Sequence, residues 1–140
     1  MSSFFILPNN PPIRPYYCDI ENIYLSNGWG ASYPPPTLEK MYANCYYILA
    51  TTGSEAIGIL RAFTDDITVT HLSEILVEKS QHGKSIGSAL MQKLIDDLGH
   101  TAIYLEALDQ PSKKLFPKFG FINKSRLMIY ARKAGKPISV

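Results

Sequence analysis

The pattern that most constrains the fold is an amphipathic helix enclosed between two strand-like segments. Apolar residues recur at four-residue intervals from Ile86 to Leu98, which is typical of a helix that buries one face, and Gly99 is expected to end it. The segments "ITVTHLSEILV" (67–77) and "AIYLEAL" (102–108) flank this helix and have the composition of strands. A strand, a helix and a second strand in this order predict a right-handed crossover between parallel strands.

The rest of the chain adds antiparallel strands and short helices. Short, turn-rich connectors join the strands expected at 46–51 and 56–63 to each other and to 67–77, which indicates antiparallel neighbours. Further strands are expected at 3–7 and 126–133, and helices at 18–30 with Asp19 as cap, at 37–45 with Thr37 as cap, and at 111–120. These elements predict an α+β fold with a mixed, mostly antiparallel sheet.

Composition and charge narrow the class of protein. The chain has 140 residues, of which 46% are hydrophobic and 19% charged, which suits a single globular domain over 1–140. Residues 1–15 supply a first strand and a Pro-rich lead-in. The net charge of +2 comes without a stripe of Lys or Arg, so no nucleic-acid partner is expected. Cys18 and Cys45 are isolated, and no metal site is expected.

Targeting signals are also missing from the start of the sequence. "MSSFFILPNNPP" lacks the basic region and the cleavage site of a secretory signal. No apolar stretch approaches the ~20 residues that a membrane-spanning helix needs. We therefore expect a soluble, cytoplasmic protein without a membrane partner.

The loop before the long helix carries the end of a nucleotide-binding motif. Gly83-Lys84-Ser85 matches the last three letters of a P-loop, but Glu78 stands where its first glycine should be. A carboxylate there would repel phosphate, so a nucleoside triphosphatase is rejected. Two interpretations remain: an anion site at the helix N-terminus, or a simple turn from strand to helix.

Three motifs together resemble the GNAT (Gcn5-related) N-acetyltransferases. "LVEKSQHGKSIGSALMQKL" is similar to motif A, with His82 in the place of a Gln or Arg, and Ser85 and Gly87 in the places of two glycines. "LFPKFGF" (115–121) is similar to motif B, and "IYLSNGW" (23–29) resembles a helix segment of a small-protein branch of the family. The resemblance covers about residues 20–133.

The resemblance implies a fold in which the fourth and fifth strands splay apart around acetyl-CoA. Backbone N–H groups of 83–88 would hold the pyrophosphate, and the edge near 75–77 would pair with the pantetheine arm. The N–H around Val77 would stabilise the oxyanion as an amine attacks directly. The implied coenzyme-binding residues are Ile75, Leu76, Val77, His82, Gly83, Lys84, Ser85, Ile86, Gly87, Ser88, Ser112, Phe116 and Lys118.

Two positions depart from the family pattern. Ser85 replaces a glycine in the first turn of the helix, where its hydroxyl could add a hydrogen bond to phosphate. Phe116 stands where many relatives have a tyrosine that protonates the departing thiolate. Either Tyr130 or a water supplies that proton, or the rate is modest, or the chain binds the coenzyme without turnover.

The general base and the acceptor pocket stay open. Glu74 is the favoured base, although it could instead pair with Arg61 or cap an edge; His71 and Glu106 are the alternatives. The expected acceptor is a primary amine on a small molecule, although a protein lysine or N-terminus is another class. Three aromatic residues either wall the acceptor pocket or belong to the core: Trp29, Tyr33 and Tyr42. Lys113 and Lys114 either reach a phosphate or face solvent. A homodimer is also compatible, with the last strand as interface.

Overall fold

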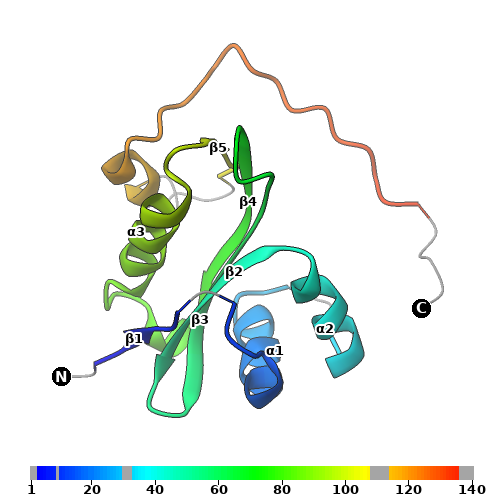
Figure 1. Cartoon of the computed structure of the whole chain (residues 1–140), viewed down its shortest axis with the longest axis vertical. Helices are drawn as coiled ribbons and strands as arrows, with labels where there is room; N and C mark the ends of the chain where they lie inside the picture. The colour runs from blue at the N-terminus through cyan, green and yellow to red at the C-terminus, as the bar shows by residue number, and fades with distance from the viewer. Residues whose placement is uncertain (1–2, 9, 30–32, 108–113, 136–140) are drawn as a thin grey trace.

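The computed structural model describes residues 3–8, 10–29, 33–107 and 114–135. Within these residues, one sheet has five strands in the order β1-β2-β3-β4-β5, as Figure 1 shows. Neighbouring strands from β1 to β4 are antiparallel, and β5 is parallel to β4. The strands are β1 (Phe5–Ile6), β2 (Tyr46–Thr52), β3 (Glu55–Thr64), β4 (Val69–Val77) and β5 (Ala102–Tyr104).

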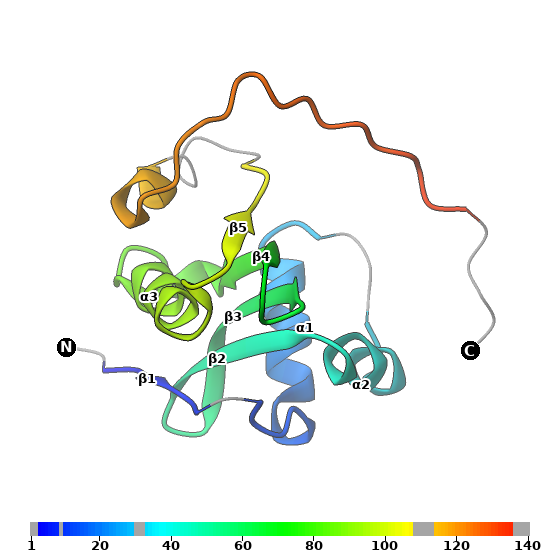
Figure 2. The same ribbon diagram turned by 45° about the horizontal axis from the view of Figure 1, so that its top comes forward.

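Helices cover both faces of the sheet. The helix α3 packs on one face, and α1 and α2 pack on the other, as both views show (Figures 1 and 2). The bounds are α1 (Tyr17–Ser26), α2 (Pro35–Ala43) and α3 (Ile86–Leu98), with 3-10 helices η1 (Arg14–Tyr16), η2 (Lys79–Gln81) and η3 (Phe116–Phe119). None of the described helices is both long and apolar enough to span a membrane.

The helix α3 connects the parallel strands β4 and β5, and the other neighbouring strands are antiparallel. The crossover and the mixed sheet expected from the sequence are therefore confirmed.

A glycine in β3 fixes how closely α3 approaches the sheet. A Cβ atom on Gly58 would lie 3.1 Å from Cγ2 of Ile86 and 3.2 Å from Cδ1 of Leu90. Only a residue without a side chain leaves this space to the first turns of α3. This contact anchors the N-terminal end of α3 beside the end of β4.

The strands β4 and β5 separate where β4 carries a bulge. Arg61 pairs with Glu74, whereas the next residue of β3, Ala62, pairs with Leu72, so that Ser73 is an extra residue in β4. Pairing between β4 and β5 starts at Val69 and Ala102 and ends at His71 and Tyr104. Beyond that point β4 continues to Val77 without a described strand on that side. The predicted splay is confirmed, and it begins at the bulge.

Both expected helix caps were wrong. Asp19 lies inside α1, where its Oδ2 atom accepts a hydrogen bond from the Ala56 N–H at 3.0 Å and ties α1 to β3. The helix α2 begins at Pro35, two residues before Thr37. A proline at the first helical position has the right φ and loses no hydrogen bond, so it starts the helix without a side-chain cap.

The strand expected at 126–133 was also wrong. The chain leaves η3 through Gly120 (φ +85°) and continues as an extended segment that pairs with no described strand. Figures 1 and 2 show it as a long arc that leads away from the sheet towards the side on which α2 lies. A strand-like sequence forms a strand only where a neighbouring edge accepts its hydrogen bonds. The strand expected at 102–108 likewise pairs only as far as Tyr104.

Candidate active site

The splay opens a cleft of about 570 Å³ between β4, the start of α3 and η3. Its floor is the part of β4 that β5 does not cover, and its ends are the segment after α1, with Asn27 and Trp29, and the loop after η2. The lining residues are Asn27, Trp29, Leu72, Ser73, Glu74, Ile75, Leu76, Val77, Gln81, His82, Gly83, Ser85, Ile86, Gly87, Ser88, Leu105, Glu106, Leu115 and Phe116. The structure thus brings Glu74 together with ten of the thirteen residues expected to bind the coenzyme.

The free edge of β4 offers backbone groups to this cleft. The Glu78 N–H donates to the Ile57 carbonyl at 2.8 Å, so this residue faces β3. Antiparallel strands alternate the direction of their hydrogen bonds, which turns the N–H groups of Ile75 and Val77 away from β3 and towards the cleft. The Val77 carbonyl accepts from Asn27 Nδ2 at 2.9 Å and contacts the His82 ring nitrogen at 2.8 Å. The Val77 N–H is consequently fixed in place as a donor.

The loop before α3 makes two left-handed turns. Gly83 has φ +82° and Ser85 has φ +65°. Ser85 therefore precedes the helix, and the sequence-based placement in the first turn of the helix was wrong. The side chain of Ser85 makes no capping hydrogen bond. The first helical bond closes between the Ala89 N–H and the Ser85 carbonyl at 3.1 Å. The N–H groups of 86–88 thus have no partner within the helix and can bind an anion.

Glu74 is a buried carboxylate with one oxygen left over. It is 5% exposed, and its Oε1 atom accepts a hydrogen bond from Arg61 Nε at 2.7 Å. The other oxygen, Oε2, is buried and has no hydrogen-bond partner among the described residues. Such an atom is costly to bury unless a donor reaches it. The pairing with Arg61, which the sequence left open, is confirmed.

Two buried tyrosine side chains lie close enough to Glu74 to interact with its charge. The hydroxyl groups of Tyr24 and Tyr42 lie 2.7 Å apart in the core between the sheet and the two N-terminal helices. Burial raises the pKa of both tyrosines, and the nearby charge of Glu74 raises each of them further. Both phenols therefore stay protonated at neutral pH and can only act as neutral hydrogen-bonding groups here.

The two alternative bases bind each other. The ring of His71 on β4 lies 2.8 Å from the carboxylate of Glu106, and both side chains are nearly half exposed. Glu106 also lines the cleft, whereas His71 does not. This pair bridges β4 and β5 just where they begin to diverge.

The side of the cleft opposite β4 is apolar. Phe116 is 7% exposed and packs against Phe121 with ring centroids 6.0 Å apart. No tyrosine is among the described lining residues. Tyr130 is 91% exposed on the extended segment, and the structure does not bring it to the cleft. A tyrosine hydroxyl for the departing group is therefore absent from the described part of this site.

The sequence of the chain matches a family model. The model of the acetyltransferase (GNAT) family matches residues 14–121, which include α1, the cleft and η3. The chain belongs to the GNAT acetyltransferase family. No curated protein matches it in sequence.

Solved structures share the fold of this acetyltransferase. A GNAT family acetyltransferase from Streptococcus pneumoniae superposes with a TM-score of 0.76 at 19% identity over 94% of this chain and 100% of its own. A protein from meticillin-resistant Staphylococcus aureus superposes with a TM-score of 0.73 at 24% identity, over 94% and 100%. AAC(6')-Iy, in complex with the bisubstrate analogue CoA-S-monomethyl-acetylneamine, superposes with a TM-score of 0.66 at 16% identity, over 95% and 100%.

Only one of the aromatic residues expected around the acceptor lines the cleft of the acetyltransferase. Trp29 does so, next to Tyr24 at a centroid distance of 5.6 Å. Tyr33 packs edge-on against Tyr24 at 5.0 Å, and Tyr42 is buried in the same cluster. The core interpretation holds for these two residues, since neither lines the cleft.

Some of the residues expected to bind the coenzyme lie outside the cleft. Lys84 is exposed and donates to Gln81 Oε1 at 3.1 Å, and Lys118 is exposed on η3. Neither is a lining residue, and Lys114 is exposed as well. Ser112 and Lys113 lie outside the described residues.

Asn27 is a residue of the candidate site that sequence reasoning missed. It follows α1, and its side-chain amide donates both to the Ile23 carbonyl, at 2.8 Å, and to the Val77 carbonyl. In the sequence, the pair Asn27-Gly28 indicated only the end of a helix. The strand partner of this amide lies fifty residues away, so no local pattern could have revealed it.

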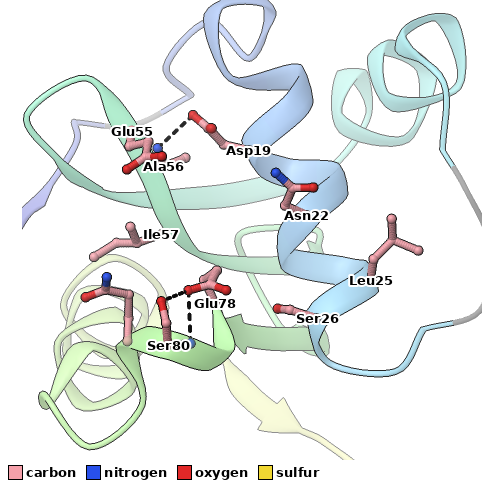
Figure 3. A pocket seen from close by; sticks show the side chains of 10 residues that line it. Asp19, Asn22, Leu25, Ser26, Glu55, Ala56, Ile57, Glu78 and Ser80 are labelled. Atoms are coloured by element: carbon pink, nitrogen blue, oxygen red, sulfur yellow. Dashed lines mark hydrogen bonds between the residues drawn. The ribbon is translucent and has the colours of Figure 1, made fainter.

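A second hollow, of about 580 Å³, lies between α1, β3 and η2 (Figure 3). Two of its three carboxylates serve the fold: Asp19 accepts from the Ala56 N–H, and Glu78 accepts from both the N–H and the hydroxyl of Ser80. Among the described residues, no group of three or more His, Cys, Asp or Glu is arranged to hold a metal ion. We therefore assign no ligand to this hollow.

Proposed function

We propose that this acetyltransferase transfers the acetyl group of acetyl-CoA to a primary amine on a small molecule. The observation that carries the proposal is the buried, unpaired Oε2 atom of Glu74, in the same cleft as a free strand edge and a helix N-terminus. An acceptor cation would supply the missing donor for that oxygen. The free edge and the helix N-terminus suit an acyl-CoA molecule.

The chain's own groups fit coenzyme A at two places. The N–H groups at the start of α3, on the left-handed turn of Gly83 and Ser85, suit a pyrophosphate. The outward N–H of Ile75 suits the amide carbonyls of a pantetheine arm, which would add to β4 as an extra strand. When bound, acetyl-CoA supplies an activated acetyl thioester.

In this proposal, Glu74 accepts a proton from the acceptor, and the Val77 N–H stabilises the acyl group during the reaction. Arg61 holds Oε1 of Glu74, so Oε2 is the atom that can accept a proton from the ammonium group of the acceptor. The Val77 N–H, held by the contacts of its own carbonyl, is the donor for the oxyanion. The amine then attacks directly, and no residue of the chain has to form a covalent intermediate.

The substrate class follows from charge and from one structural neighbour. The carboxylates of Glu74 and Glu106 line the cleft, while no Lys or Arg is among its described lining residues, so a cationic acceptor is favoured. AAC(6')-Iy shares the fold and binds an analogue that joins CoA to an acetylated neamine, a small molecule. The charge supports a cationic amine, and the ligand of this neighbour is the reason to propose that the amine belongs to a small molecule.

A specific observation favours a second candidate function. Phe116 places an apolar ring where a proton donor would serve the departing thiolate, and a general acid typically contributes ~10²–10⁴-fold to a rate. A chain that binds acetyl-CoA without turnover would need no such donor. A water in the cleft could protonate the thiolate in the enzyme, at a modest rate.

Glu74→Gln tests the proposal. We expect kcat/KM for amine acetylation, measured as thiol release, to fall by about 10²–10⁴-fold near neutral pH, because the amide cannot accept the proton. The rise in Tm caused by acetyl-CoA should persist, because Glu74 does not hold the coenzyme. The control, Glu106→Gln, removes an exposed carboxylate of the same cleft and should cost far less.

Three outcomes would contradict separate parts of the proposal. Full turnover in Glu74→Gln would rule out this carboxylate as the base. The absence of any Tm shift with acetyl-CoA and with free CoA would rule out the coenzyme site. A Tm shift without thiol release across a broad panel of amines would favour the non-catalytic module.

A further inference from the structure

The hydroxyl groups of Tyr24 on α1 and Tyr42 on α2 form a buried pair with one proton to spare. The two residues are 0% and 3% exposed, and their hydroxyl oxygens lie 2.7 Å apart. A hydrogen bond between two hydroxyl groups uses one of their two protons, and either group can be the donor here. Among the described residues, the pair makes no second hydrogen bond of ordinary geometry, so one buried proton is left without an acceptor.

Glu74 has the complementary defect in the same core. Its Oε2 atom is a buried acceptor, while Arg61 Nε holds Oε1 at 2.7 Å. The guanidinium carbon of Arg61 also lies 5.8 Å from the ring centroid of Tyr42, which places the tyrosine pair next to the ion pair. Burial is the largest cause of the raised pKa of both tyrosines, and the charge of Glu74 adds to it. Tyr24 is the nearer of the two, because hydrogen bonding towards the carboxylate also contributes to its raised pKa.

Titratable groups face Glu74 from each element packed against it. Arg61 does so from β3, Tyr24 from α1, Tyr42 from α2, and Cys45 from the turn between α2 and β2. Burial raises the pKa of the Cys45 thiol, so this group is uncharged at neutral pH. Arg61 is thus the one charged partner of Glu74 within this set. Burial by itself favours the neutral form of a carboxyl group, and a neutral Glu74 could not accept a proton.

We propose that Tyr24 and Tyr42 are positioning residues for Glu74: Tyr42 donates to Tyr24, and Tyr24 donates its own proton to Oε2 from the core side. An ionised carboxylate oxygen has two lone pairs, so one stays free for the acceptor in the cleft. The hydrogen bond stabilises the ionised form of Glu74 and directs the free lone pair of Oε2 to the cleft.

This inference rests on the proposed function, in which Oε2 takes a proton from the ammonium group of the acceptor. In that step an N–H bond of the acceptor breaks and an O–H bond forms at Oε2, while both tyrosine hydroxyl groups keep their protons. The tyrosine pair therefore acts through Glu74 and does not touch the substrate.

Tyr24→Phe tests the inference, because it removes the donor and keeps the aromatic ring. The ionised form of Glu74 loses a hydrogen bond, so its neutral form persists to higher pH. We expect the acidic limb of the profile of kcat/KM against pH to move up by about one pH unit. At a fixed pH on that limb kcat/KM falls about tenfold, while the plateau at higher pH changes little.

Two further variants separate this role from a structural one. Tyr42→Phe leaves Tyr24 as a donor but removes the hydrogen bond that strengthens it, so we expect a smaller shift in the same direction. Tyr33→Phe is the matched control, because Tyr33 packs edge-on against Tyr24 at a centroid distance of 5.0 Å while its hydroxyl is not part of the pair. This control should leave the acidic limb in place.

Carbon NMR of protein with isotope-labelled glutamate carboxyl groups measures the same ionisation without turnover. The signal of Glu74 is the one that disappears in Glu74→Gln, and its titration midpoint should move to higher pH in Tyr24→Phe. A shifted midpoint in a chain that acetylates no amine would overturn the proposed function but not this inference. An unshifted midpoint in Tyr24→Phe, or in Tyr42→Phe if the first variant does not fold, would overturn the inference, as would an equal shift in Tyr33→Phe.

Discussion

Ser85 carries backbone strain at the centre of the proposed coenzyme site. Its φ of +65° lies in the left-handed region, which costs a residue other than glycine roughly 1–2 kcal/mol. The resemblance placed a family glycine here, and in this chain the position has the left-handed conformation that glycine adopts without strain. This chain keeps the turn despite the serine.

Replacement of this serine by glycine should therefore stabilise the protein. We expect Ser85→Gly to raise the free energy of unfolding by about 0.5–1 kcal/mol, since relief of strain exceeds the entropic cost of a glycine. Urea unfolding at 25 °C measures the change. Gly83→Ala is the matched control: its φ of +82° makes it lose about 1–2 kcal/mol, although its Cβ would meet no neighbour within 4 Å. Equal stability of all three chains would refute this account.

Glu74 shows how one bulge can place a candidate catalytic residue. The extra residue Ser73 lets Leu72 join the core under α3, while Glu74 faces Arg61 and the tyrosine pair on the other side. Without the bulge, strict alternation would turn Leu72 and Glu74 to the same face. The sequence contained both residues but not the irregularity that separates them.

At the scale of elements, the turn between β3 and β4 depends on one carboxylate. Asp65 accepts hydrogen bonds from the N–H groups of Ile67, Thr68 and Val69 and from the Thr68 hydroxyl. These bonds hold the pKa of Asp65 well below its ordinary value. The turn sets the register of the two longest strands, and therefore the position of the cleft edge of β4.

The sign of the pH dependence follows from this lowered pKa. Because Asp65 releases its proton more readily when folded, its stabilisation is present above the unfolded pKa of about 3.9 and is lost as the pH falls below it. We expect Asp65→Asn to be less stable than the unaltered chain at pH 7, with the gap shrinking towards pH 2.5. Urea unfolding at both pH values measures it, and Thr68→Val, which removes one donor, should fall between. A gap independent of pH would contradict this role.

At the scale of the whole molecule, stability and coenzyme binding should be linked. If acetyl-CoA binds only the folded chain, the Tm rises with the concentration of acetyl-CoA by mass action. We expect a stabilisation of about 2.7 kcal/mol when acetyl-CoA is present at about 100 times its Kd. Thermal unfolding over a series of acetyl-CoA concentrations measures the rise, and acetate, which lacks the coenzyme, is the control. A Tm that acetyl-CoA leaves unchanged would contradict the proposed coenzyme site.

Local patterns predicted the parts of the fold whose signals are local. The apolar period of α3 and the turn-rich connectors were sufficient for the crossover and the antiparallel strands. The resemblance carried by the motif before α3 added the splay and many of the residues that line the cleft. They failed at the caps of α1 and α2, where Asp19 instead bonds to a distant strand and a proline starts the helix. They also missed Asn27.

The sequence by itself determined the order of the elements, the family and the chemical groups that the cleft could contain. Only the tertiary structure decided that Glu74 pairs with Arg61, that Ser85 is left-handed, that Tyr33 and Tyr42 belong to the core, and that residues 126–133 pair with no described strand. The physical reason is the range of the interactions. Periodicity and turn residues act between neighbours in the chain, whereas ion pairs, amide contacts and strand edges join residues that only folding brings together.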